Sequence, residues 1–464
     1  MLKRIALIFG YFGLALVIVG STVALVAYGN DYVYDFSTRS IIQKGHVIIN
    51  SLPNGVRITE DGKLLKKKTP YQAAYKVGTH TFELAKDGFH PWKKALEVVA
   101  GRVALANYVI LLPLKPETKQ IDVKPQIISQ SISKDHRHLA YVTGGADAAV
   151  YILDLPDGKA VKLYTPRAAT PTQPAEVLQG VTWSDDASHV LITSDLGGQP
   201  LHLFMAASAN ASVLSLTEKF GFNLSGLQFS GSNWRQLYWI SPDGLRRLDA
   251  DAQTVSGVLA DKVTQFWIQP ERVMYVRRTE FGSALWSLDS KGRRTEIVAA
   301  LPASDSYTVA YSKFSGDDHV VVIPASTQTA TLYTAVFGDT PSSKVLAHGV
   351  TGARFSPDGH VLALTAPTTI QTYDLERSAL LHEVVMYTVA GLPGTLTSLE
   401  WFDDHHFIMT RDNVAYWSEF DGANRVELGA TYGGFALYSS SDTRSIYATQ
   451  PAVTGAKISQ IVIR

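Results

Sequence analysis

The fold is decided by a short stretch that the chain repeats, and residues 355–364 are its clearest copy. They read Phe-Ser-Pro-Asp-Gly-His-Val-Leu-Ala-Leu. An aromatic residue ends one strand, a Ser-Pro-Asp-Gly turn follows, and a strongly apolar run begins the next strand. Such apolar runs between turn formers are typical of buried strands. The stretch therefore predicts a β-hairpin whose second strand lies in a core.

The same unit occurs eight times in the distal part of the chain. Its turns begin near residues 133, 184, 230, 268, 315, 356, 402 and 439. The spacings run from 37 to 51 residues, close to the ~40–45 residues that four strands and their turns need. A four-stranded sheet cannot bury both faces alone, so units of this kind pack radially around an axis.

The turn Phe355–Gly359 resembles the turn of TolB-like and WD-repeat-like β-propellers. This resemblance covers residues 126–464 and implies a propeller of about eight four-stranded blades. It implies no particular function, because propellers host many unrelated roles. The last blade ends at Ile458–Ile463 as its third strand. We therefore expect residues 119–124 to supply the missing strand, so that the propeller domain covers 119–464.

The pattern of apolar runs and turn residues in residues 45–118 predicts a small domain of short strands separated by turns. Its motifs, in order, are Ser51-x-Pro53-x-Gly55-Val56, Asp61-Gly62, Thr69-Pro70, Gly78-x-His80 and Asp87-Gly88-Phe89. These motifs resemble the PEGA domain, a small bacterial β-domain, although Pro53-Asn54-Gly55-Val56 stands in place of the name-giving tetrapeptide. The resemblance implies a β-sandwich-like accessory module that binds envelope polymers or proteins and brings no catalytic residues.

The N-terminus predicts a membrane anchor. Residues Ile5–Tyr28 carry no charge, and 24 residues of helix span about 36 Å, enough for a hydrocarbon core of ~30 Å. Lys3 and Arg4 precede this run, while Asp31 and Asp35 follow it. The positive-inside rule then keeps the N-terminus in the cytoplasm and places the remaining chain outside.

We therefore expect residues 1–29 to be a cytoplasmic stub with a transmembrane signal-anchor helix, followed by a linker over residues 30–44. The alternative is a cleaved signal peptide with Ala27-Tyr28-Gly29 as its cleavage site. The apolar run is longer than the ~7–15 residues of the apolar h-region of a usual signal peptide, which favours the anchor. Both interpretations place the bulk of the protein outside the cytoplasm.

Charge is unevenly distributed along the chain. The totals of 42 basic and 42 acidic residues balance, which argues against a nucleic-acid partner. Residues 30–125 nevertheless carry 15 basic and 9 acidic side chains, a balance of +6. Lys3 and Arg4 add +2, so residues 126–464 carry −8. The densest basic cluster is Lys66-Lys67-Lys68, expected in a loop. It is either a solvated loop or a contact for anionic lipid or wall polymer, where each basic residue gains ~1 kcal/mol.

Motifs for catalysis or metal binding are not found. The chain has no cysteine, which excludes disulfides and thiolate chemistry. His382-Glu383 begins a zinc-protease pattern, but Met386 stands where the second histidine is needed. The acid pairs Asp185-Asp186, Asp317-Asp318 and Asp403-Asp404 all fall at the repeat turns, so we interpret them as turn residues. We expect no catalytic residues, no cofactor, no metal and no enzymatic activity.

The sequence therefore predicts a single-pass membrane protein of the cell envelope. A PEGA-like module near the membrane or wall would carry a propeller that binds a protein or polymer partner through loops on one face. One alternative is an envelope-acting enzyme with its site in the propeller channel. Another is a passive spacer between membrane and outer layer.

Overall fold

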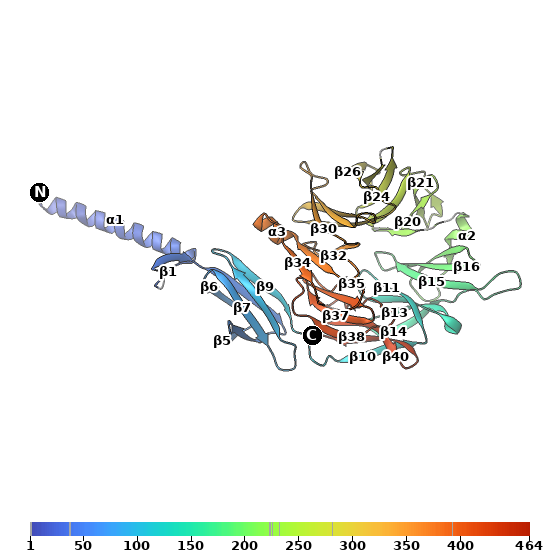
Figure 1. Ribbon diagram of the computed structural model, residues 1–464, viewed down its shortest axis with the longest axis horizontal. Coiled ribbons are helices and arrows are strands. Elements are labelled where there is room, and N and C mark those ends of the chain that lie inside the picture. The colour runs from blue at the N-terminus through green and yellow to red at the C-terminus, as the bar shows by residue number, and fades with distance from the viewer. Residues whose placement is uncertain are drawn as a thin grey trace. The chain divides into compact units, whose positions relative to one another are not determined.

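The computed structural model describes residues 2–36, 39–221, 224, 226–231, 233–280, 282–391 and 393–464. The chain divides into two compact units, Met1–Pro116 and Glu117–Ile463, with the division two residues before the expected boundary. Strands dominate both units (Figure 1). Each unit has its own hydrophobic core, and each is described by itself below.

Unit 1 begins with helix α1 (Leu2–Gly29). Within it, Gly10–Gly29 form a 20-residue apolar segment of mean hydropathy 2.0, and none of this segment is buried by the rest of the protein. The helix stops at Asn30, whose side-chain amide donates to the carbonyl of Val26 over 2.8 Å. By length and composition the apolar segment can cross a membrane or serve as a signal sequence.

Residues 30–44, expected as a linker, instead contain a hairpin of two short strands. β1 (Tyr32–Asp35) pairs antiparallel with β2 (Ser40–Gln43), so that Tyr34 lies opposite Ile41. Aromatic and β-branched residues favour a strand here. The shortness of the strands and their flanking charges explain why the sequence alone reads as a linker.

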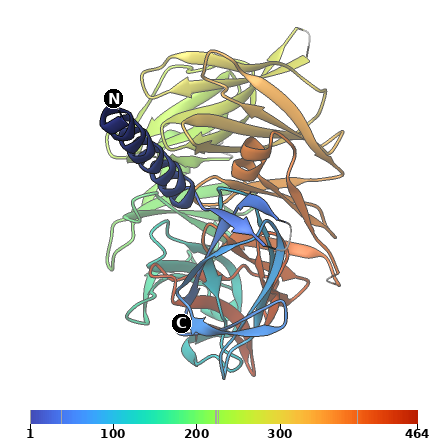
Figure 2. The same ribbon diagram turned by 90° about the vertical axis from the view of Figure 1, so that its left-hand side faces the viewer.

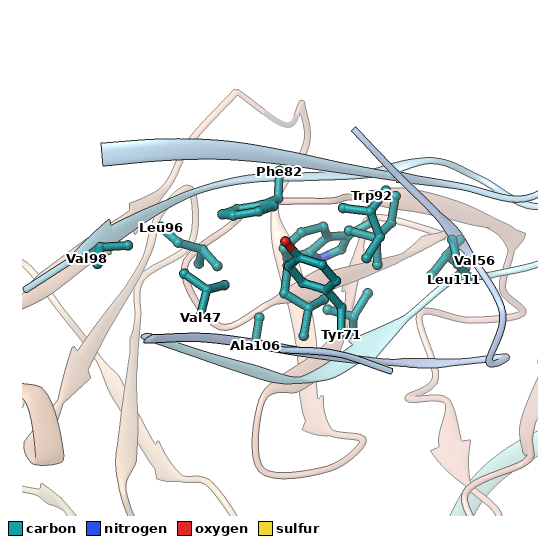
Figure 3. Packing of buried hydrophobic residues seen from close by; sticks show 13 residues of the cluster. Val47, Val56, Tyr71, Phe82, Trp92, Leu96, Val98, Ala106 and Leu111 are labelled. Atoms are coloured by element: carbon teal, nitrogen blue, oxygen red, sulfur yellow. The ribbon is translucent and has the colours of Figure 1, made fainter. Parts of the chain in front are cut away.

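The rest of unit 1 is a sandwich of two small sheets. The first has the order β6–β3–β9 with bounds Tyr71–Tyr75, Gly45–Leu52 and Val103–Ile110. The second has the order β5–β4–β7–β8 with bounds Lys63–Lys68, Arg57–Glu60, Gly78–Ala85 and Trp92–Val98. Alternate residues of the strands point inward, and Val47, Phe82 and Trp92 meet in the core between the sheets (Figure 3).

The lysine cluster lies on a strand and not in a loop. Lys66, Lys67 and Lys68 end β5, which pairs only with β4 and is therefore an edge strand. Lysine is unfavourable in central strands but is typical of exposed edges, where its charge prevents pairing with other chains. All three lysines are exposed.

The described residues of unit 2 form eight four-stranded antiparallel sheets, which we number as blades in chain order. Blades 1 to 4 comprise β11 (Ile127–Ile132), β12 (His138–Thr143), β13 (Ala149–Asp154), β14 (Lys159–Tyr164); β15 (Glu176–Trp183), β16 (His189–Leu196), β17 (Pro200–Ala206), β18 (Leu214–Ser215); β19 (Gln228–Ser230), β20 (Asn233–Ser241), β21 (Gly244–Asp249), β22 (Thr254–Val255); β23 (Val263–Gln269), β24 (Arg272–Thr279), β25 (Gly282–Asp289) and β26 (Arg294–Leu301).

Blades 5 to 8 continue the same order. They comprise β27 (Tyr307–Phe314), β28 (Asp317–Pro324), β29 (Thr329–Thr334), β30 (Ser342–His348); β31 (Gly352–Phe355), β32 (Val361–Thr365), β33 (Ile370–Asp374), β34 (Met386–Val389); β35 (Leu396–Trp401), β36 (His406–Arg411), β37 (Val414–Glu419), β38 (Val426–Ala430); β39 (Tyr438–Ser439), β40 (Ser445–Ala452), β41 (Gly455–Val462) and β10 (Thr118–Lys124).

The sheets form a propeller. First strands of successive blades contact one another, as β11 does β15 and β23 does β27, so the first strand of each blade lies nearest the axis. The colours of Figure 2 follow one another around this ring from teal through green and orange to red. The core lies between adjacent blades, where Ala140 and Val142 of one sheet pack with Val190 and Ile192 of the next. The architecture is therefore the predicted all-β propeller.

The ring closes through its two ends. β10 pairs antiparallel with β41, and Lys119 lies opposite Gln460, as the sequence predicts for residues 119–124. Gly455 opens β41 with φ +127, and an added Cβ would lie only 2.2 Å from the carbonyl oxygen of Pro125. This close approach of two backbones requires glycine.

Unit 2 also contains short helices that the sequence analysis did not predict. They are η1 (Gly145–Asp147), α2 (Leu216–Phe220) and α3 (Leu375–Leu381). α3 stands between the third and fourth strands of blade 6 (orange in Figure 1). Its first turn is capped by Asp374, whose carboxylate accepts the backbone N–H of Arg377 over 2.8 Å, and it ends where His382 adopts φ +55.

Candidate functional site

The repeated turns are built around a serine hydroxyl and an aspartate carboxylate. In blade 1, Ser133 Oγ donates to Asp135 Oδ1 over 2.5 Å and accepts the backbone N–H of His138 over 2.9 Å. Asp135 also accepts the backbone N–H of Arg137. The same three bonds recur in the turns that start at Ser184, Ser356 and Ser440. These side chains satisfy backbone groups of the turn, so their role is structural.

The acid pairs that the sequence singles out lie on different blades and are not brought together. Asp186 and Asp403 accept backbone N–H groups in their own turns. Asp185 forms a 2.5 Å ion pair with Lys134 of the preceding blade. Asp318 accepts the hydroxyl of Tyr311, and Asp404 accepts the backbone N–H of Asp358. Their contacts are those of turn and inter-blade residues.

A dense group of ionisable side chains lies between blades 6 and 7. His360 Nδ1 contacts both carboxylate oxygens of Asp358, at 2.6 and 2.7 Å. The ring of His405 lies 4.9 Å from that of His360, and His406 Nδ1 lies 2.9 Å from Asp403 Oδ1. These groups bond chiefly to one another.

Burial and pairing move the pKa values in this group in opposite directions. Burial alone would raise the pKa of Asp358, but hydrogen bonds from His360 and Ser356 lower it to about 2. Burial alone would lower the pKa of His360, but the Asp358 carboxylate raises it. Burial, reinforced by the charge of His360, lowers the pKa of His405 to about 4. These shifts favour a charged imidazole at His360 and a neutral one at His405. His360 is only 6% exposed, while Asp358 lies exposed at the turn, and the two side chains bond to each other.

A cavity lies beside α3 in unit 2. Its volume is about 470 Å³, and blades 5 and 6 form its walls. Leu332, Tyr373 and Leu375 supply an apolar floor, and all three are buried. Ligand sites of this size are commonly apolar with a few polar groups at the edge. We call this space the α3 cavity.

Charged side chains surround the α3 cavity. Lys344 reaches it from β30, Asp317 from β28, and Glu376 and Glu383 from α3 and the turn after it. His319 also lines it, and burial lowers the pKa of this imidazole, which favours its neutral form. The space can therefore hold an apolar group whose polar substituents reach the charged edge.

In the sequence, His382-Glu383 is only an incomplete zinc-protease pattern, and no motif predicts this cavity. Both residues line the cavity. Among the described residues, they belong to no cluster with metal-ligand geometry. The sequence offered one signal, an Asp374 cap followed by a seven-residue helix inside a β repeat. The sequence does not predict the cavity wall opposite α3, because strands of blade 5 form that wall.

A second cavity of about 430 Å³ lies where the first strands of blades 2 to 4 meet the turns after them. It is lined by Lys134, Asp185, Gln228 and Gln269, among others. Lys134 and Asp185 bond to each other there. Because the first strands lie nearest the axis, this is the part of unit 2 in which the sequence analysis placed an alternative enzyme site.

In unit 1, Glu60, Asp61 and His80 place their ligand atoms within 4.8 Å of one another. His80 Nδ1 lies 3.1 Å from Glu60 Oε1 and 3.4 Å from Asp61 Oδ2, while its Nε2 lies 3.0 Å from the carbonyl oxygen of Lys76. A carbonyl only accepts, so Nε2 donates to it. The contacts of His80 with Glu60 and Asp61 tie β7 to β4 and the turn after it. The sequence analysis named His80 and Asp61 only as family motifs.

The geometry of unit 1 agrees with a known family. Residues 44–111 match the PEGA domain family. These residues form a PEGA domain. The match covers the two-sheet sandwich from β3 to β9 and lies within the expected range of 45–118, apart from its first residue.

Some of the solved structures that are similar to the chain are β-propellers. The Dos1 propeller aligns with 8% identity and a TM-score of 0.48 over 75% of this chain and 94% of that chain. An oligogalacturonate lyase from Vibrio parahaemolyticus aligns with 9% identity and a TM-score of 0.40 over 76% and 94%. At these values the likeness concerns the fold alone, and the order of strands in the eight sheets carries the propeller assignment. No curated protein sequence matches the chain at a significant level.

The PEGA domain and the propeller fold support a binding or scaffold role in general.

Proposed function

We propose that this chain is a membrane-anchored binding protein of the cell envelope, with both β units outside the cytoplasm. The observation that carries the proposal is the apolar segment Gly10–Gly29, none of which the protein buries. Twenty residues of helix measure about 30 Å, which matches the hydrocarbon thickness of a bilayer. Lys3 and Arg4 at the start of α1, before the apolar segment, and Asp31 after the helix support a cytoplasmic N-terminus.

The proposed role of the propeller is binding and not catalysis. Several of its ionisable residues bond to one another, as in the Asp358–His360 and Lys134–Asp185 pairs. The α3 cavity, by contrast, combines an apolar floor with charged edges, which suits recognition of an envelope protein or polymer. Binding through this cavity distinguishes the proposal from a passive spacer, which needs no saturable site.

A second contact is proposed for the PEGA domain. Lys66, Lys67 and Lys68 are consecutive and exposed on the edge strand β5. They belong to the part of the chain with excess positive charge. Anionic lipid or an anionic wall polymer is the complementary surface, and the attraction weakens as salt screens it.

The test is sedimentation of residues 30–464 with purified cell-wall material over a salt series. Replacing Ala379, which lines the α3 cavity, by tryptophan fills that space. Arg377→Trp places the same side chain on α3 outside the cavity lining and is the matched control. Saturable binding that is lost in Ala379→Trp and kept in Arg377→Trp supports the propeller as the binding element.

The lysines are tested in parallel by the triple change Lys66→Gln, Lys67→Gln and Lys68→Gln. If the PEGA domain contacts an anionic surface, this variant binds roughly tenfold or more weakly at low salt, and the difference vanishes at high salt. Equal binding of the wild type and both changes at every salt concentration contradicts both proposed contacts.

A further inference from the structure

The hairpin that follows α1 has one face that the protein leaves uncovered. Tyr32 and Tyr34 are alternate residues of β1, so they point to the same side, and Ile41 lies opposite Tyr34 in β2. Their exposed fractions are 43% for Tyr32, 51% for Tyr34 and 70% for Ile41. Phe36, just after β1, is 84% exposed and packs edge-on against Tyr34 with ring centroids 5.0 Å apart. We call these four side chains the aromatic face.

Polar contacts fasten the hairpin to the PEGA domain. Asp35 forms a 2.8 Å ion pair with Lys76 of the loop before β7, and its side chain is only 10% exposed. Asp31 Oδ2 lies 2.6 Å from His46 Nε2 of β3, and the backbone N–H of Lys44 donates to the carbonyl of Asp31. The charged side chains of β1 and its preceding turn are therefore paired within unit 1, while the aromatic face stays free.

The position of the hairpin in the chain indicates what covers that face. If Gly10–Gly29 fill the hydrocarbon core, Gly29 lies at its edge, and Tyr32 follows three residues later. The headgroup layer extends ~5–8 Å beyond the hydrocarbon on each side. Tyrosine is enriched at this depth, because its ring is apolar while its hydroxyl remains hydrated.

We infer that the β1–β2 hairpin lies in the headgroup layer, where Tyr32, Tyr34, Phe36 and Ile41 contact lipid and hold the PEGA domain against the membrane. This inference rests on the proposed membrane insertion of α1. The contact of Asp31 with His46 and the ion pair of Asp35 with Lys76 then hold the hairpin and the PEGA sandwich together. The hairpin therefore fixes the PEGA domain at the membrane interface and does not act as a flexible linker.

The natural chain has no cysteine, so single spin labels report one position each. The full chain is reconstituted in vesicles of phosphatidylcholine and phosphatidylglycerol with a label at Ile41→Cys, Val17→Cys or Gln72→Cys. Collision rates with oxygen, which dissolves in lipid, and with a water-soluble nickel chelate give the depth of each label. Val17 reports the insertion of α1, and Gln72 is an exposed position of β6 in the PEGA domain.

The inference predicts that the Ile41 label has a several-fold higher oxygen-to-nickel ratio than the Gln72 label, and a lower ratio than the Val17 label. Equal ratios at Ile41 and Gln72 with a deep Val17 overturn the hairpin inference and leave the anchor in place. A water-accessible Val17 overturns the anchor itself. Spin–spin broadening at Ile41 that disappears on dilution in lipid shows a second copy on the aromatic face and also overturns the inference.

A second variant tests the side chains directly. Tyr32→Ser, Tyr34→Ser and Phe36→Ser together remove most of the aromatic face, and the Ile41 label is then expected to move toward the nickel chelate. The matched control is Val103→Ser with Leu105→Ser, since these side chains are 54% and 50% exposed on the PEGA domain and lie outside the hairpin. A shift of equal size in the control contradicts a specific role for the aromatic face.

Discussion

Single side chains hold the repeated turns of the propeller, and Ser184 is a clear case. Its hydroxyl donates to Asp186 and accepts the backbone N–H of His189, and the residue is fully buried. Ser184→Ala leaves a buried N–H without its acceptor, so we expect it to lower the free energy of unfolding by about 1–3 kcal/mol. Denaturant unfolding followed by tryptophan fluorescence measures the change. Ser342→Ala, at an exposed position of β30, is the control and is expected to change it by less than ~0.5 kcal/mol.

The pKa of His405 predicts a pH effect. Burial lowers it to about 4 in the folded protein, below the ~6.5 of a free imidazole. Between these values the unfolded chain binds a proton that the folded chain does not, so stability falls as the pH is lowered from 6.5 to 4. We expect His405→Asn to remove on the order of 2 kcal/mol of this loss. Unfolding at pH 7 and at pH 4.5 measures it.

An exposed histidine gives the matched comparison for that experiment. His348→Asn, on β30, is expected to keep the pH dependence of the wild type. If His405→Asn and His348→Asn show the same difference between the two pH values, burial of His405 is not the cause of the acid sensitivity.

At the scale of elements, closure of the ring depends on the approach of β41 to the end of β10. In Gly455→Ala the new methyl group would lie 2.2 Å from the carbonyl oxygen of Pro125 and 2.4 Å from that of Lys124. Both oxygens belong to the backbone, so no side-chain rotation can relieve the clash with the methyl group. We expect a loss of about 3 kcal/mol in unfolding free energy, with faster hydrogen exchange in β10 and β41. Gly292→Ala, at φ +82 with open space around it, is the control and is expected to cost ~1 kcal/mol.

The elements that sequence predicts well are those with a repeated pattern. Eight copies of one turn gave the blades, and the missing strand of the last blade pointed to residues 119–124 as its partner. Short elements outside the repeat were not predicted. β1 and β2 have four residues each, and the lysines of β5 resemble a loop until their place on a sheet edge is known. The α3 cavity could not be foreseen, because Leu332 and Leu375 meet only once two blades are packed.

At the scale of the whole molecule, three parts of the sequence have three different physical demands. The apolar helix is left uncovered by the protein and can cross a membrane or serve as a signal sequence, the small PEGA sandwich buries its own core, and the ring of sheets buries apolar residues between blades. Composition distinguishes helix α1 from the PEGA sandwich and the propeller, because the apolar segment of α1 has 20 consecutive residues without charge. We therefore propose that α1 anchors the chain, that the PEGA domain lies at the membrane interface and that the propeller binds a partner.

The most direct test of this account is the side of the membrane on which the propeller lies. Val453→Cys introduces the chain's one cysteine at a fully exposed position in the turn between β40 and β41. Intact cells that express the full-length variant are treated with a membrane-impermeant maleimide, and their membranes are then washed with alkaline carbonate. The account predicts a labelled, full-length chain that stays in the membrane pellet. Labelling only after lysis, or release of the chain by carbonate, contradicts it.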